Sequence, residues 1–208
     1  MDWQRIAYTL IGLLIGAVFH EYMHARIADA MGDHTARAAG RLTLNPVPHI
    51  DPIGTIIMPI ALILISGGRF AFGYAKPVPV NFNNLHDQRK GMILVSAAGI
   101  VTNTLLAFIS LFLLQLINPA PFGAMATFLI YMAQINIMLA AFNLIPIPPL
   151  DGSKILLGFS SAQFQYSLAR LEPYGFFIII GLLYLGILNP LISLFEWFIT
   201  GFISLLLP

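Results

Sequence analysis

Three ionisable residues lie close together near the end of an apolar run that starts at Ile6. They are His20, Glu21 and His24, in the stretch FHEYMHA. Residues four apart face the same side of a helix, so His20 and His24 can bind one metal ion. Glu21 is offset by one position, where its carboxylate can reach a water molecule on that metal. This arrangement is the zinc-hydrolase signature, in which zinc activates the water and the glutamate accepts its proton.

The same three residues have other interpretations, namely a buried polar cluster or a proton or metal path. A charge inside a bilayer costs roughly 2.5–3.5 kcal/mol, so ionisable groups there mark function by default. A transporter is expected to carry repeats and broken segments in both halves of its chain, and only one half of this sequence has such segments. We favour a hydrolase and keep a membrane metal or proton transporter as the alternative.

A catalytic zinc usually takes three protein ligands and leaves a fourth position for water. The chain has no cysteine, so the third ligand must be His, Asp or Glu. Asp151 ends the stretch AFNLIPIPPLDGSK, where three prolines and Gly152 interrupt a predicted helix. Broken helices at membrane depth are tolerated where they line a water-filled cavity. Asp151 is therefore the candidate third ligand, and an ordinary interfacial aspartate at a helix end is the alternative.

The elements that must position these residues are membrane helices. Of the 208 residues, 58% are hydrophobic and 9% charged, against about 25% charged in soluble domains. Spans need roughly 20 apolar residues, and the runs that qualify lie at about 5–30, 91–117, 124–147, 173–188 and 190–207. We predict an all-α polytopic membrane protein with about five to six transmembrane helices. It also has a short re-entrant segment and a small β-hairpin-like loop near 74–80.

The segment 53–67 is short and interrupted by Pro59, which favours re-entry over a full crossing, although the sequence leaves this open. Within the first helix, Gly12-x-x-x-Gly16 predicts close packing on a neighbouring helix. No repeat, linker or second domain is visible. We therefore predict one domain over 1–208, with a catalytic core at about 5–160 and an accessory helical hairpin at about 173–207.

Lysine and arginine predict the orientation, because they collect on the cytoplasmic side of the membrane. Seven of them can be cytoplasmic if 5–30 runs from outside to inside and 53–89 makes no net crossing: Arg26, Arg37, Arg41, Arg89, Lys90, Lys154 and Arg170. The segments 5–30 and 124–147 are then parallel, which places Asp151 on the same side as His20 and His24. No basic cluster suited to nucleic acid is present.

The two motifs together resemble the site-2 protease family of intramembrane zinc metalloproteases. HEYMH is followed by NLIPIPPLDG, whose family pattern matches at Asn143, Pro146, Leu150, Asp151 and Gly152. The segments GRLTLNPVPHIDPIGT and FGYAKPVPVN are similar to the compact prokaryotic subgroup, which lacks PDZ and nucleotide-binding regulatory domains. The resemblance covers about residues 10 to 160.

This resemblance implies one zinc ion held by His20, His24 and Asp151, with Glu21 as general base. It also implies that Asn143 contacts the substrate backbone or the developing oxyanion. A transmembrane helix must unwind before its carbonyls can be attacked, and an extended edge beside the zinc could accept it by strand addition. The resemblance assigns that role to 72–80, and we expect Phe72, Gly73, Tyr74 and Ala75 to bind substrate. A plain proline-rich connecting loop is the alternative.

The expected function is an intramembrane zinc endopeptidase that cuts single-pass membrane proteins near the cytoplasmic face, in a prokaryotic plasma membrane. Its expected partners are the transmembrane substrate and the bilayer, and its oligomeric state is left open. The family's Gly-Pro-x-x-Asn pattern departs here to Gly99-Ile100-Val101-Thr102-Asn103, so the role of Asn103 is open. His49 and His86, in polar loops, are expected to face solvent.

Overall fold

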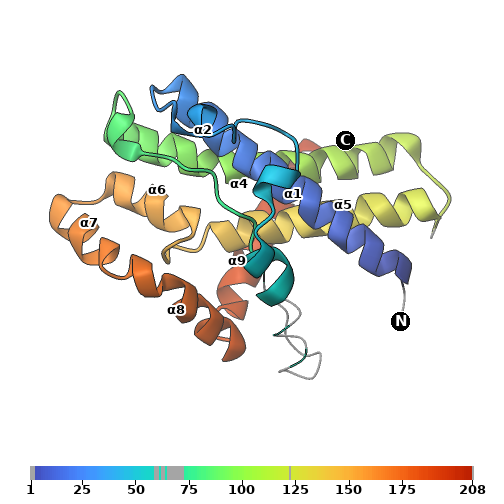
Figure 1. Cartoon of the computed structure of the whole chain (residues 1–208). Helices are drawn as coiled ribbons and strands as arrows, with labels where there is room; N and C mark the ends of the chain where they lie inside the picture. The colour runs from blue at the N-terminus through green and yellow to red at the C-terminus, as the bar shows by residue number, and fades with distance from the viewer. Residues whose placement is uncertain (1–2, 59–60, 62–63, 65–72, 122, 208) are drawn as a thin grey trace.

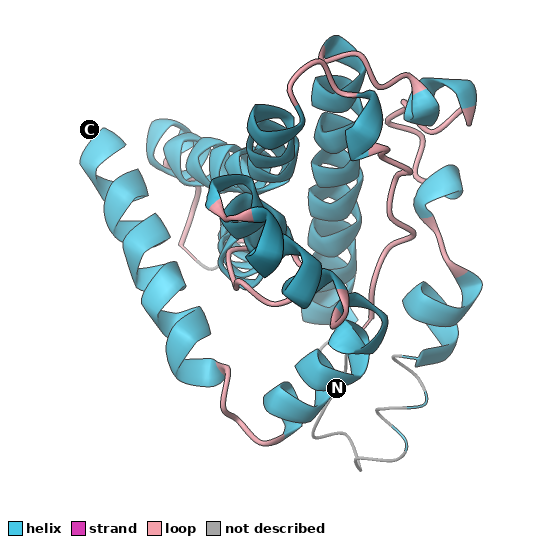
Figure 2. Cartoon of the chain, turned by 90° about the vertical axis from the view of Figure 1, so that its left-hand side faces the viewer, coloured by secondary structure: helices cyan, strands magenta, loops and turns pink. Residues whose placement is uncertain are grey.

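The computed structural model describes residues 3–58, 61, 64, 73–121 and 123–207. Its helices are α1 (Trp3–Ala30), α2 (Thr35–Ala38), α4 (Gln88–Ile117), α5 (Ala124–Asn143), α6 (Asp151–Phe159), α7 (Ala162–Ala169), α8 (Glu172–Tyr184) and α9 (Asn189–Leu206). Three short helical turns are η1 (Val47–His49), η2 (Pro52–Ile57) and η3 (Phe82–Asn84). Figure 2 shows helices and loops and no strand among the described residues. The all-α prediction is confirmed.

Within the described residues, four helices are long and apolar enough to cross a membrane: α1, α4, α5 and α9, with 28, 30, 20 and 18 residues. At 1.5 Å per residue, about 20 residues span the 30 Å hydrocarbon core. In Figure 1, α4 and α5 run side by side, α1 crosses in front of them, and α9 passes behind. The chain is therefore a multi-pass membrane protein, and four of its predicted spans are found.

The predicted span at 173–188 is shorter than expected, because α8 ends after 13 residues. Gly186 has a φ of 71°, and its N–H donates to the carbonyl of Leu183 while Ile187 donates to Leu182. This pair of bonds is the Schellman motif, in which a left-handed glycine closes a helix. At about 1.5 Å per residue, α8 is only about 20 Å long, which is too short to cross a bilayer on its own.

Small residues of α4 and α5 pack together in the core, and α9 covers them. Ala107 of α4 meets Ala140 and Ala141 of α5, and Ile199 and Ile203 of α9 cover them. On α1, the two glycines of the Gly-x-x-x-Gly pattern face α5, where an added Cβ would lie 3.0 Å from Ile135 and 2.8 Å from Asn136. Small side chains let membrane helices approach closely, as that pattern predicted.

The described part of the 53–67 segment begins as η2, whose N-cap Asp51 accepts a hydrogen bond from Gly54 N at 2.6 Å. Most of the remaining segment lies outside the described residues, so whether it crosses or re-enters stays a prediction. Residues 73–81, called here the extended segment, form no β-ladder within the described residues. The expected extended chain is found there, but the expected hairpin pairing is not. Pro77 and Pro79 explain this, because they remove two ladder donors from one edge.

Two ends of the molecule differ in composition. At one end, on the left of Figure 1, lie the C-terminal end of α1 with α2, and below them α6 and α7. The N-terminus and the connection between α4 and α5 lie at the other end. The seven basic residues expected in the cytoplasm belong to α1 after His24, to α2 and the loop after it, to the first turn of α4, to α6 and to the residue after α7. Most of the basic residues therefore lie at the first of these ends.

Candidate metal centre

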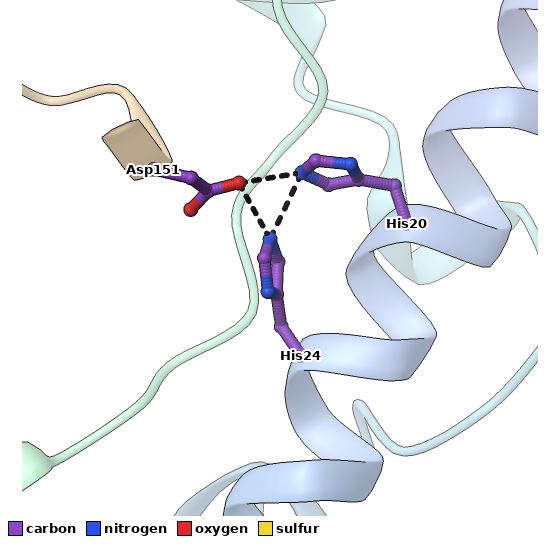
Figure 3. A group of neighbouring side chains, drawn as sticks. All are labelled: His20, His24 and Asp151. Atoms are coloured by element: carbon purple, nitrogen blue, oxygen red, sulfur yellow. Dashed lines mark hydrogen bonds and ion pairs between the residues drawn. The ribbon is translucent and has the colours of Figure 1, made fainter. Parts of the chain in front are cut away.

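His20 and His24 lie one turn apart on α1, and Asp151 is the first residue of α6 (Figure 3). The two Nε2 atoms are 2.9 Å apart, and Asp151 Oδ2 lies 3.1 Å from each of them. All three residues are buried, at 6–8% exposure. The structure thus brings together one oxygen and two nitrogen atoms from segments more than a hundred residues apart.

Two glycines make this approach possible. A Cβ on Gly152 would lie 2.2 Å from the carbonyl oxygen of Leu144, so the reversal between α5 and α6 needs glycine. A Cβ on Gly99 of α4 would lie 2.4 Å from His20 Cε1 and 2.6 Å from His24 Cε1. Real Cβ atoms do not approach other atoms so closely. The backbone of α4 therefore forms the wall against which the imidazole rings lie.

Each imidazole is fixed by a hydrogen bond on its other nitrogen. His20 Nδ1 lies 2.7 Å from Asn103 Oδ1, and His24 Nδ1 lies 2.7 Å from the carbonyl oxygen of Val95. Asn103 Nδ2 donates to the carbonyl of Gly16 and to Asn136 Oδ1, so its oxygen faces the imidazole. Both Nδ1 atoms therefore carry the proton, and both Nε2 atoms are left with a lone pair. Such outer partners orient metal-binding histidines.

The three facing atoms fit a cation. Two Nε2 lone pairs and a carboxylate oxygen would repel one another without a positive charge between them. Asp151 Oδ2 is buried and has no hydrogen-bond donor in the described part of the protein. The separations of 2.9–3.1 Å are near the roughly 3.3 Å between ligands of a tetrahedral zinc with 2.0–2.1 Å bonds. Among the described residues, these three form the one group able to hold a metal ion.

Glu21 lies between this cluster and the extended segment. Its Oε2 accepts a hydrogen bond of 2.6 Å from the backbone N–H of Val78, 57 residues along the chain. The side chain is half-buried. The carboxylate expected to act as general base is therefore already engaged with the segment expected to bind substrate.

The residues expected to bind substrate have different positions. Asn143 ends α5, is half-buried, and donates from Nδ2 to the carbonyl of Leu139 in its own helix at 3.0 Å. Gly73 and Tyr74 are exposed and Ala75 is half-buried. The ring of Tyr74 packs edge-on against Phe176 of α8, with centroids 5.6 Å apart. Phe72 lies outside the described residues.

Sequence reasoning did not assign the polar residues behind the histidines. Asn103 and Asn136 are fully buried, in the middle of apolar runs on α4 and α5. Their position alone was a usable signal, because polar side chains inside a membrane span are expensive and usually bond another helix. The role of Asn103, which the sequence left open, is to hold the His20 ring.

Comparison with known proteins gives a consistent result. The model of peptidase family M50 matches residues 117–185, which include Asp151. Relatives that carry the name "Putative zinc metalloprotease" include YwhC of Bacillus subtilis, 39% identical over 91% of this chain and 84% of its own length. Rip2 of Mycolicibacterium smegmatis is 29% identical over 91% of this chain and 72% of its own. MJ0611 of Methanocaldococcus jannaschii is 32% identical over 71% of this chain and 68% of its own length.

No solved structure matches the chain. The similarity to YwhC extends over 91% of this chain, a share large enough to include both the histidines of α1 and Asp151. Of the two functions that the sequence left open, the protease and the transporter, the family supports the protease. This chain belongs to peptidase family M50, the site-2 proteases, and is a zinc metalloprotease of that type.

Proposed function

We propose that this protease hydrolyses peptide bonds of single-pass membrane proteins near the cytoplasmic face of the cell membrane, as in regulated intramembrane proteolysis. His20, His24 and Asp151 hold one zinc ion, and Glu21 is the general base. The observation that carries this proposal is the convergence of two imidazole lone pairs and a carboxylate oxygen at 2.9–3.1 Å. Their burial among the helices supports a reaction site that is shielded from bulk water.

Zinc, when bound there, polarises a carbonyl group and lowers the pKa of a water molecule to about 7. The remaining work belongs to side chains of the protein. Glu21 takes the proton of the attacking water and delivers it to the leaving nitrogen, the task of a positioned carboxylate in acid–base catalysis. Asn103 and the Val95 carbonyl keep the Nε2 atoms of His20 and His24 aimed at one point. Asn143, at the end of α5, contacts the substrate backbone or the developing oxyanion.

The extended segment supports substrate binding by strand addition. Tyr74, Lys76 and Val78 donate their N–H groups to Gly54, His49 and Glu21 of the protein itself. Between them, Ala75 has neither its N–H nor its C=O bonded within the described part of the chain. An unwound substrate can pair with that edge. Pro77 and Pro79 have no N–H and the N–H of Tyr74 is already bonded, so donation to a substrate comes from Gly73 and Ala75, two of the expected binding residues.

The basic end of the molecule supports a cytoplasmic location for the centre. The metal ligands lie toward the C-terminal end of α1 and the start of α6, and the arginines and lysines near them favour the cytoplasmic side. We also propose that residues 1–208 act as one domain, with a catalytic core at about 5–160 and an accessory helical pair at about 173–207. Figure 2 places α9, which ends at the C-terminus, at one edge of the bundle.

The proposal is tested with protein purified in detergent, by measuring bound zinc and cleavage of a model single-pass substrate. Wild type is expected to bind one zinc ion per chain and to cut the substrate. Glu21→Gln should retain zinc and cut on the order of 10²- to 10⁴-fold more slowly. Equal cleavage by the two proteins excludes Glu21 as base. Metal flux into liposomes without peptide products would instead support a transporter.

A further inference from the structure

Arg41 is a buried cation that lies outside the metal centre. Its exposure is 8%, and within the described residues no carboxylate lies within ion-pair distance of it. Its guanidinium donates to the carbonyl oxygen of Lys76 at 2.8 Å and approaches that of Pro77 at 3.4 Å. Buried arginine normally pairs with a carboxylate, and an apolar residue of similar volume is often as stabilising. Packing alone therefore does not account for a cation here.

His49 holds the backbone of the same residue, Lys76, through its N–H group. Its backbone carbonyl accepts the N–H of Lys76 at 2.9 Å. Its Nε2 lies 2.9 Å from the carbonyl oxygen of Thr43, so Nε2 donates and closes the loop over residues 43–49. The ring is 2% exposed, which makes the expectation of a solvent-facing His49 wrong, whereas His86 is exposed as expected. The stretch GRLTLNPVPH thus supplies both partners of the Lys76 backbone.

The position of Lys76 determines the position of Val78. In an extended chain, residues two apart point the same way, so fixing one backbone group fixes the next but one. Val78 donates its N–H to Glu21 Oε2, and its side chain packs with Ala25 and Ala36. A continuous series of contacts therefore runs from Arg41 through Lys76 and Val78 to Glu21.

We propose that Arg41 is a positioning residue for the protease reaction. By holding the carbonyls of Lys76 and Pro77, it sets the register of the extended segment against Glu21. That register decides both the orientation of the base and which substrate bond lies opposite it, because the substrate pairs with the same segment. This inference rests on the proposed roles of Glu21 and the extended segment, and it adds a role for an arginine that touches neither metal nor substrate.

Three single variants of the full-length protein test the proposal: Arg41→Met, Arg41→Lys and the control Arg37→Met. Arg37 is an exposed arginine of α2 that pairs with Asp29. Its replacement removes one positive charge, as Arg41→Met does, but does not affect the extended segment. The measurements are bound zinc, kcat, KM and the masses of the products from one transmembrane substrate. Melting temperatures of all variants report any loss of folded protein.

We expect Arg41→Met to keep zinc but to lower kcat on the order of 10- to 100-fold, as small displacements of catalytic groups do. It should also cut at additional neighbouring bonds, because the register is no longer fixed. Arg41→Lys should have a kcat between those of wild type and Arg41→Met. The lysine ammonium keeps the positive charge but lacks the planar, forked set of donors of a guanidinium. Arg37→Met should match wild type in kcat and in product masses.

A second test combines Arg41→Met with Val78→Pro, which removes the N–H that Glu21 accepts. If Arg41 acts through Val78, the double variant should be little slower than Val78→Pro alone, a non-additive result. Additive losses in kcat would overturn the proposal and indicate a general effect on stability. Wild-type kcat and product masses in Arg41→Met would also overturn it. Failure of the proposed function looks different, because wild type then does not cut or Glu21→Gln cuts equally well.

Discussion

The metal centre and the extended segment are neighbours that are held in different ways. His20 and His24 lie on one continuous helix, and each imidazole is anchored through its second nitrogen to α4. The extended segment has no regular secondary structure, and side chains and loop carbonyls clamp it at Tyr74, Lys76, Val78 and Asn81. The two imidazole rings are therefore fixed by bonds to α4, whereas the extended segment keeps the backbone groups of Ala75 unpaired within the described residues.

This difference follows from what each region must bind. A metal ion needs ligands held at fixed distances, and helices supply that rigidity through their own backbone bonds. An unwound substrate needs unpaired backbone groups, which a helix cannot offer. The protein combines the two by joining them at one contact, the hydrogen bond from Val78 N–H to Glu21. Variants that change one region and leave the other intact separate their contributions, from the largest effect on activity to the smallest.

Asp151→Ala should remove the one proposed zinc ligand that comes from outside α1. We expect loss of zinc after dialysis and a loss of cleavage at least as large as the 10²- to 10⁴-fold expected for removing a catalytic acid–base group. Zinc content by elemental analysis checks this, with Ser160→Ala as a control because its hydroxyl bonds only its own helix turn. Unchanged zinc retention would show that Asp151 is not the third ligand.

Asn103→Leu should weaken the centre without removing a ligand. His20 would lose its Nδ1 partner, and removing such an outer-shell partner costs on the order of 10- to 100-fold in metal affinity. Competition with a zinc chelator measures the affinity. Thr104→Val is the matched control, because that neighbouring hydroxyl bonds the carbonyl of Ile100 in its own helix. Equal zinc affinities in the two variants would show that Asn103 does not position His20.

Ala75→Pro should affect the extended segment and leave the centre intact. It removes one unpaired N–H, and the preference of a residue before proline for extended backbone suits Tyr74, which lies in a segment without helix. Loss of one hydrogen bond of about 0.5–1.5 kcal/mol predicts roughly a 2- to 10-fold lower kcat/KM with normal zinc content. Steady-state kinetics on a transmembrane substrate checks this. An unchanged kcat/KM would argue against strand addition at this edge.

Asp33→Asn should mainly change stability and its pH dependence. Burial alone raises the pKa of Asp33, but hydrogen bonds from Thr35, Asn84 and Asn81 outweigh burial and hold the pKa below its ordinary value. A lowered pKa stabilises the fold above the ordinary value of about 3.9, and this contribution is lost as pH falls further.

The variant should therefore have a lower melting temperature than wild type at pH 7, and the difference should shrink as the pH approaches 3. Thermal unfolding at both pH values, with zinc-dependent cleavage as the activity control, measures this. A difference that is independent of pH would mean that the charge of Asp33 contributes nothing.

Much of the molecule could be predicted from sequence because the signals are local. Long apolar runs predicted α1, α4, α5 and α9, and the His-Glu-x-x-His spacing placed two imidazoles on one face. The length of the helix predicted at 173–188 was overestimated, because hydropathy alone does not show that Gly186 adopts a left-handed conformation and ends the helix. His49 was misplaced for a similar reason, since a polar loop can fold inward when its groups bond the backbone.

The sequence by itself determined the helical class, the membrane environment and the types of ligand atom, because side-chain chemistry and apolar length are properties of the chain. Only the tertiary structure decided that Oδ2 of Asp151 meets the two Nε2 atoms at 3.1 Å, and that Asn103 and Val95 orient them. The physical reason is that these contacts join segments 71 to 131 residues apart, and packing of α1, α4 and α6 fixes distances that local propensity does not encode.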